Sequence, residues 1–252
     1  MALSALFAQA VCAEVCPTAT ARQAEDLTVN EGATCEITNN KDVKDKVTNN
    51  GTIIFKNSGS GLKFTGTTGG TITIGNGTTH GTIKVQGNAT IDALASNSNG
   101  LTIEGQDISV DKSYALTLKA TKITFGGNSG NNKFVTISGD SYVHSSTSYK
   151  NILLDTTTEI TLKDLTLTNV RMSGSALTAL TNTKLTLNNS YITSDAELII
   201  KGENTNSTFI VQKDSKNTIS AKTITFNTTN ATHTFKGEGI IDFQAGTITL
   251  GG

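Results

Sequence analysis

The chain has 252 residues, with 20 basic and 21 acidic side chains and a formal net charge of −1. A neutral surface of this kind lacks the positive patch that binds nucleic acid or an anionic membrane surface, so we expect neither partner. The sequence holds 24 Gly, one Pro and no Trp. Thr and Asn fill many of the remaining positions, which favours many short strands joined by turns over helices.

Residues 1–13, MALSALFAQAVCA, form an apolar run in which small residues are spaced as at a signal-peptidase cleavage site. We predict that they are the remnant of a secretion signal, although no Lys or Arg precedes the apolar run. An N-terminal helix that caps the domain is the alternative. No later segment approaches the roughly 18 consecutive apolar residues of a membrane helix, so we expect no membrane span in this chain.

Residues 14–48 are predicted to form an N-terminal cap. Cleavage after Ala13 would remove Cys12 and leave Cys16 and Cys35 as the two cysteines of the mature chain. Two cysteines in an exported protein most simply form a disulfide, which contributes roughly 3 kcal/mol in the chain-entropy model. The alternative is a pair of free thiols in an intracellular protein.

Residues 49–252 repeat one pattern of short strands. Most strands are four to six residues long by their alternation of apolar and polar residues, and a Gly, Asn, Asp or Ser lies near each break. The pattern predicts an all-β chain, a right-handed parallel β-helix of about ten rungs with about 20 residues in each. Inward Ile, Leu, Val and Phe would stack into a core, and outward Thr and Lys would form ladders. An antiparallel β-sandwich is the alternative fold.

The sequence holds few candidate catalytic groups, and we expect no catalytic residue, no cofactor and no metal ligand. Solvated surface positions are the better interpretation for the three histidines, His80, His144 and His233. Gly139, Asp140 and Ser141 match only part of a serine-protease motif, because Tyr142 stands where the second Gly should be. A polar turn explains these residues better.

Two further patterns are weak. Three pairs of carboxylates lie four or five residues apart, too far along a β-coil to lie side by side: Asp107 and Asp111, Asp155 and Glu159, and Glu159 and Asp164. Thr-x-Thr segments are typical of ice-binding solenoids, but their uneven gaps predict that the Thr pairs do not align on successive rungs.

Several strand-like segments, GTITIGNGT, GLTIEGQ, KITFGGN and GTITLGG, resemble the β-helical passenger domains of Gram-negative autotransporters. The likeness covers roughly residues 51–252 and is strongest to surface adhesins and to vacuolating-cytotoxin-like proteins. It implies export to the bacterial cell surface or outer membrane. Such proteins normally finish with a membrane β-barrel, for which this chain has no room.

We therefore expect a secreted or surface-displayed structural and adhesive protein that binds a host-surface protein, a glycan or a neighbouring cell. A polysaccharide lyase or glycoside hydrolase with the same fold is the main alternative, and a self-assembling extracellular filament subunit is a lesser one. We also expect the last strands of the chain to mediate self-association through Ile240, Phe243, Ile248 and Leu250.

Overall fold

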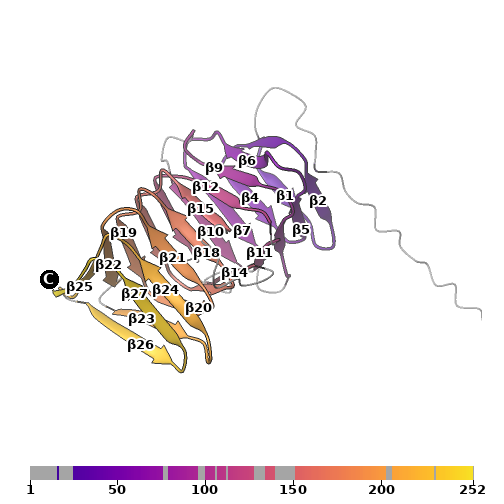
Figure 1. Ribbon diagram of the computed structural model, residues 1–252. Coiled ribbons are helices and arrows are strands. Elements are labelled where there is room, and N and C mark those ends of the chain that lie inside the picture. Colours follow the sequence, from indigo (N-terminus) through magenta and orange to yellow (C-terminus); the bar gives the residue numbers. More distant parts are fainter. Residues whose placement is uncertain are drawn as a thin grey trace, which may run out of the picture.

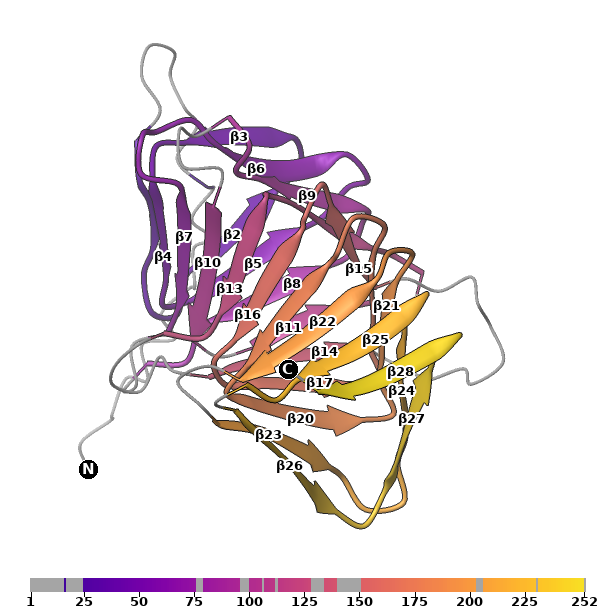
Figure 2. The same ribbon diagram turned by 90° about the vertical axis from the view of Figure 1, so that its left-hand side faces the viewer.

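The computed structural model describes residue 16 and residues 25–75, 79–95, 100–105, 107–111, 113–127, 134–139, 151–202, 206–229 and 231–251. Within these residues the chain forms 28 strands and no helix, so no helix here is long and apolar enough to cross a membrane. Each strand from β1 to β25 pairs in parallel with the strand three further along the chain, and the described residues form a three-sided coil (Figures 1 and 2).

Three sheets form the sides of the coil. Sheet A contains β1 (Leu27–Val29), β4 (Lys46–Asn49), β7 (Gly70–Ile74), β10 (Gly100–Gly105), β13 (Lys122–Phe125), β16 (Glu159–Leu162), β19 (Ala179–Asn182), β22 (Leu198–Gly202), β25 (Thr223–Asn227) and β28 (Thr247–Gly251). Sheet B contains β2 (Thr34–Ile37), β5 (Thr52–Phe55), β8 (Thr82–Val85), β11 (Asp107–Val110), β14 (Val135–Gly139), β17 (Leu165–Thr168), β20 (Lys184–Asn188), β23 (Asn206–Val211) and β26 (Thr232–Gly237). Sheet C contains β3 (Asn40–Val43), β6 (Ser60–Phe64), β9 (Ala89–Asp92), β12 (Leu116–Lys119), β15 (Ile152–Asp155), β18 (Arg171–Gly174), β21 (Tyr191–Ser194), β24 (Lys216–Ser220) and β27 (Ile240–Gln244).

The predicted right-handed parallel β-helix of about ten rungs is confirmed. Among the described residues the first strand begins at Leu27, so the range 14–48 that we expected to form the cap contains β1 to β3, one complete turn, and most of β4.

Turn length varies because the corners, and not the strands, accept extra residues. Leu162 pairs with Asn182, which is 20 residues further on, whereas Phe125 pairs with Leu162, which is 37 further on. The additional residues of the longer turn lie in the connections before and after β14. The strands therefore keep one register while the sequence spacing changes.

The core is a set of apolar stacks along the coil axis. In sheet A, for example, Ile72, Ile103, Phe125 and Leu162 are partners on successive turns, and each is at most 1% exposed. Alternate residues of each strand point inward, which is the physical origin of the period-two pattern in the sequence.

The corner between sheets B and C recurs with one backbone feature. Asn169, Asn189 and Asp214 stand at this corner on three successive turns with φ of 55°, 49° and 59°. Asn and Asp tolerate this left-handed conformation better than most residues, because their short side chains bond locally to the backbone. These residues turn the chain sharply from sheet B to sheet C, so that short strands can follow one another around the coil.

Candidate functional site

A ladder of Thr side chains runs along the outward face of sheet A. Its members are partners on five successive turns and all are half-buried: Thr71, Thr102, Thr124, Thr161 and Thr181. Lys46 precedes this row and Lys201 follows it. At the usual strand spacing of about 4.8 Å, the five side chains span about 19 Å. The row itself carries no charge, and Glu104, Lys122 and Glu159 flank it on the same face. We call this row the threonine ladder.

The prediction that Thr-x-Thr pairs do not align on successive rungs is wrong for β25 and β28, where Thr223 pairs with Thr247 and Thr225 with Thr249. Single Thr residues also stay in register over longer distances, since the corner connections absorb the extra residues. Paired Thr rows do not run the length of this ladder. Thr73, the second Thr of its segment, lies beside Glu104 and donates a 3.0 Å hydrogen bond to its carboxylate. The ladder is therefore one hydroxyl wide over these turns.

Sheet C carries a ladder of alternating charge on its outward face. Five successive turns place there, in register, Asp42, Lys63, Asp92, Lys119 and Asp155. Lys119 and Asp155 form a 3.2 Å ion pair. Each charge has only opposite charges above and below it, so neighbouring turns attract one another and the five side chains leave a net charge of only −1.

Three of the five candidate carboxylates are each bound to a Lys of a neighbouring turn. Asp155 pairs with Lys119 at 3.2 Å, Glu159 with Lys122 at 2.8 Å, and Asp164 with Lys184 at 2.9 Å. Asp107 and Asp111 lie at opposite ends of β11. None of these ion pairs is visible in the sequence, because the partners lie 20 to 37 residues apart.

The electrostatics of Glu159 oppose a role as general acid. The hydrogen bond from Lys122 lowers the pKa of the Glu159 carboxyl, and the charges of Lys122 and Lys201 lower it further. A glycosidase acid needs a raised pKa in order to hold its proton at neutral pH. Glu159 instead remains ionised and forms an ion pair with Lys122 of the preceding turn of sheet A.

His233 corrects one sequence-based expectation, because it is not a solvated surface residue. Its side chain points into the coil from β26, where Ser207 Oγ lies 2.7 Å from Nδ1 and the carbonyl oxygen of Asn227 lies 3.0 Å from Nε2. A carbonyl only accepts, so Nε2 carries the proton and Ser207 donates to Nδ1. Ser207 is 1% exposed. This Ser–His pair therefore links two turns of the coil, and the buried Ser207 hydroxyl is not accessible to a substrate as a nucleophile.

The other motif residues fall in different places. His80 is exposed in the connection between β7 and β8, and Gly139 ends β14. His144, Asp140 and Ser141 lie outside the described residues. Among the residues that the structure describes, no group of three His, Cys, Asp or Glu side chains could hold a metal ion.

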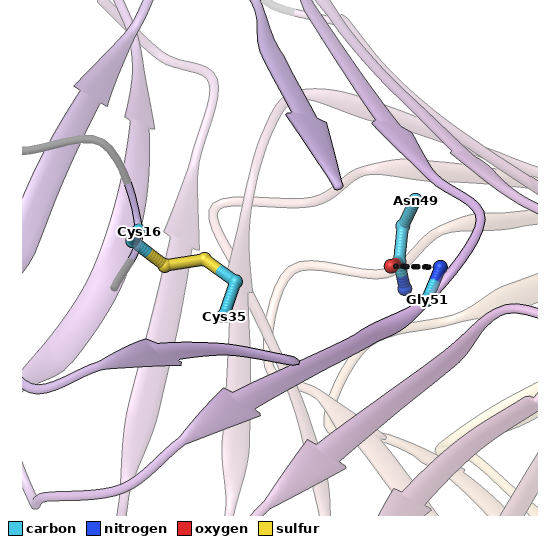
Figure 3. Close-up of a disulfide and its surroundings, with 4 residues drawn as sticks. All are labelled: Cys16, Cys35, Asn49 and Gly51. Carbon is cyan, nitrogen blue, oxygen red and sulfur yellow. Dashed lines mark hydrogen bonds between the residues drawn. A yellow bond between two sulfur atoms is a disulfide. The ribbon is translucent and has the colours of Figure 1, made fainter. Parts of the chain in front are cut away.

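The first turn is closed by a disulfide between Cys16 and Cys35, the pair expected from the sequence (Figure 3). Their Cα atoms are 4.7 Å apart, and Cys35 points into the core from β2 with 2% of its surface exposed. The corner beside it is braced by Asn49, which accepts a hydrogen bond from Gly51 N at 3.2 Å and donates one to the Thr82 carbonyl at 2.8 Å. The inward apolar side chains of the first turn, β1 to β3, are buried.

The last described turn, β26 to β28, is aromatic and partly exposed. Phe209 and Phe235 stack at 4.9 Å, and Phe226 and Phe243 meet edge to face at 5.2 Å. Of the four residues expected to mediate self-association, Phe243, Ile248 and Leu250 face the inside of the coil and Ile240 faces outward. Leu250 is 77% exposed.

Comparison of the chain with models of protein families, with curated proteins and with solved structures gives no match. The fold and its surfaces must therefore support any functional argument by themselves.

Proposed function

We propose that this chain is an exported β-helix, similar to the passenger region of an autotransporter, that is displayed at a bacterial surface. In this proposal it acts as a stalk and an adhesive surface without catalysis, and its target is a host-surface protein, a glycan or a neighbouring cell. The disulfide at Cys16 and Cys35 supports an oxidising compartment, because such bonds persist mainly in exported proteins.

The threonine ladder is the observation that carries the adhesive proposal. Five hydroxyl-bearing side chains in one register offer a repeating set of donors and acceptors along about 19 Å, which suits an extended ligand such as a polysaccharide or a flat protein surface. Solenoids bind through long faces of this kind. With little charge on the strip, we expect binding that depends weakly on salt.

Variants that remove only the hydroxyls test this site. Thr102, Thr124 and Thr161 are changed together to Val, which keeps β-branching and removes the hydrogen-bonding groups. The matched control changes three in-register Thr residues of sheet B, Thr136, Thr166 and Thr186, in the same way. We expect the sheet A variant to lose about tenfold or more in adhesion to cells or to a glycan array. Equal adhesion of both variants would refute the role of the ladder.

Cell fractionation and protease shaving test the location. A surface-displayed chain would be removed by external protease from intact cells. A chain that stays wholly cytoplasmic and intact under this treatment would contradict the proposal.

A further inference from the structure

Asn50 and Gly51 form the corner between β4 and β5, and an Asn–Gly sequence is chemically labile. In a mobile chain the backbone nitrogen of the residue after an Asn attacks the side-chain amide carbon. Glycine permits this attack best, because it has no side chain to shield its nitrogen. The N–Cγ bond forms, the Cγ–Nδ2 bond breaks, and ammonia leaves with the proton of the Gly nitrogen. Water then opens the cyclic imide to Asp or to isoaspartate.

The fold requires the glycine at this corner. A Cβ atom at Gly51 would collide with the backbone carbonyl oxygens of Asn30 and Ala33 in the first turn. A residue without a side chain therefore fits best where the second turn packs on the first. The side-chain oxygen of Asn50 is buried and has no hydrogen-bond partner among the described residues. The packing of the corner thus keeps a labile sequence in place, with an amide that is not anchored through its oxygen.

Asn49 holds the attacking nitrogen in its unreactive state. Gly51 N donates a hydrogen bond to Asn49 Oδ1 at 3.2 Å, and Asn49 is fully buried (Figure 3). The nitrogen must lose this proton before it bonds to Asn50 Cγ. Ring closure therefore has to break the bond to Asn49, which the closed corner resists.

The first turn holds the backbone on both sides of Gly51. Asn50 N donates to the Val29 carbonyl oxygen at 2.8 Å, and Thr52 N donates to the Ala33 carbonyl oxygen at 2.9 Å. Val29 ends β1, and Ala33 directly precedes β2, which the disulfide cross-links. Loss of the disulfide should therefore loosen the first turn and release the corner that packs on it.

We propose that Asn50 is a deamidation site gated by the disulfide between Cys16 and Cys35. While the bond is intact, the first turn and Asn49 keep the side-chain amide unreacted. When a thiol reductant breaks the bond, the corner opens and Asn50 converts to Asp or isoaspartate. Isoaspartate adds a carbon to the backbone, which does not fit the close approach at Gly51, so the change records the loss of the disulfide permanently. This inference does not depend on the adhesive function.

Peptide mapping by mass spectrometry tests the gate in the whole chain. Deamidation at Asn50 is followed at neutral pH with and without a thiol reductant, and the same site in guanidinium gives its unfolded rate. We expect reduction to raise the rate about tenfold or more, toward the unfolded rate. In the double variant Cys16→Ala and Cys35→Ala the rate should be high from the start, and the reductant should add nothing.

Asn189 and Ser190 provide a matched internal control on a distant turn. Ser190 N donates to Asn217 Oδ1 at 2.9 Å, so this Asn–Ser sequence is held in the same way. Its rate, compared with its own unfolded rate, should not change on reduction. Loss of protection at both sites, an intact Asn50 in the reduced chain, or equal rates at Asn50 with and without the disulfide would each overturn the inference.

The variant Asn49→Ala tests the hydrogen bond to Gly51 and should raise deamidation of Asn50 in the oxidised chain. Asn182→Ala is its matched control. Asn182 is also fully buried at the end of a strand of sheet A, and its amide donates to a carbonyl of sheet B, that of Thr208. Asn50 should remain an amide in this control. Equal deamidation of Asn50 in both variants would refute the part of Asn49 in the gate.

Discussion

Removal of the disulfide gives a sharp test of how the first turn is held. We consider the double substitution Cys16→Ala and Cys35→Ala, because Ala adds no polar group at the buried position in β2. The two cysteines are 19 residues apart in the sequence. For a loop of about 20 residues the chain-entropy model gives a loss of about 11 cal/mol/K, which is about 3.3 kcal/mol at 25 °C.

The loss should be local. In a coil each turn contacts only its neighbours, so stability is distributed along the chain and the first turn depends most on its own cross-link. We expect amides of β1 to β3 to exchange about 100-fold faster or more in the double variant, which corresponds to about 3 kcal/mol. Amides of β16 to β22 should keep their protection.

The assay combines hydrogen exchange with guanidinium unfolding of the wild type, the double variant and the wild type in reductant. The last two should agree, because both lack the bond. Cys12→Ala, which removes the third cysteine, should leave the exchange of β1 to β3 unchanged. A loss below about 1 kcal/mol in β1 to β3, or an equal loss along the whole coil, would refute the reasoning.

Three other predictions concern the core and one ion pair. Phe125→Ala should lower the unfolding free energy by about 3–5 kcal/mol in denaturant titration, because the fully buried ring leaves a cavity, whereas Phe125→Leu should cost much less. Asn182→Asp should cost about 3 kcal/mol at neutral pH, since a fully buried carboxylate replaces the amide that donates to the Thr208 carbonyl at 3.2 Å. Burial raises the folded pKa of the new carboxyl, so the variant should regain stability as pH falls; no such recovery would count against this reading. The contact with Lys122 lowers the folded pKa of Glu159 below its usual 4.5. The contact therefore stabilises the fold above pH 4.5, and this contribution is lost as the pH falls through the folded pKa of Glu159. Glu159→Gln should flatten this part of the stability profile in unfolding measured from pH 3 to 7, and an unchanged profile would show that the contact contributes nothing.

The sequence by itself determined the strands and the class of fold. Segments such as Gly70–Ile74 and Lys122–Phe125 alternate apolar and polar residues, and this local pattern fixes which side chains can share a face whatever lies above them. The inward position of His233 was present in the same alternation, since His233 and Phe235 lie two residues apart, but the surrounding Thr residues favoured a surface position.

Only the tertiary structure decided which residues meet across turns. Thr124 and Thr161 are separated by 37 residues and Thr161 and Thr181 by 20, yet the three stand in one row, because loops at the corners take up the difference. The ion pairs of Asp155, Glu159 and Asp164 depend on the same registers. Strand pairing in a coil is a contact between residues distant in sequence, so local propensity sets the strand and the stacking of whole turns sets its neighbours.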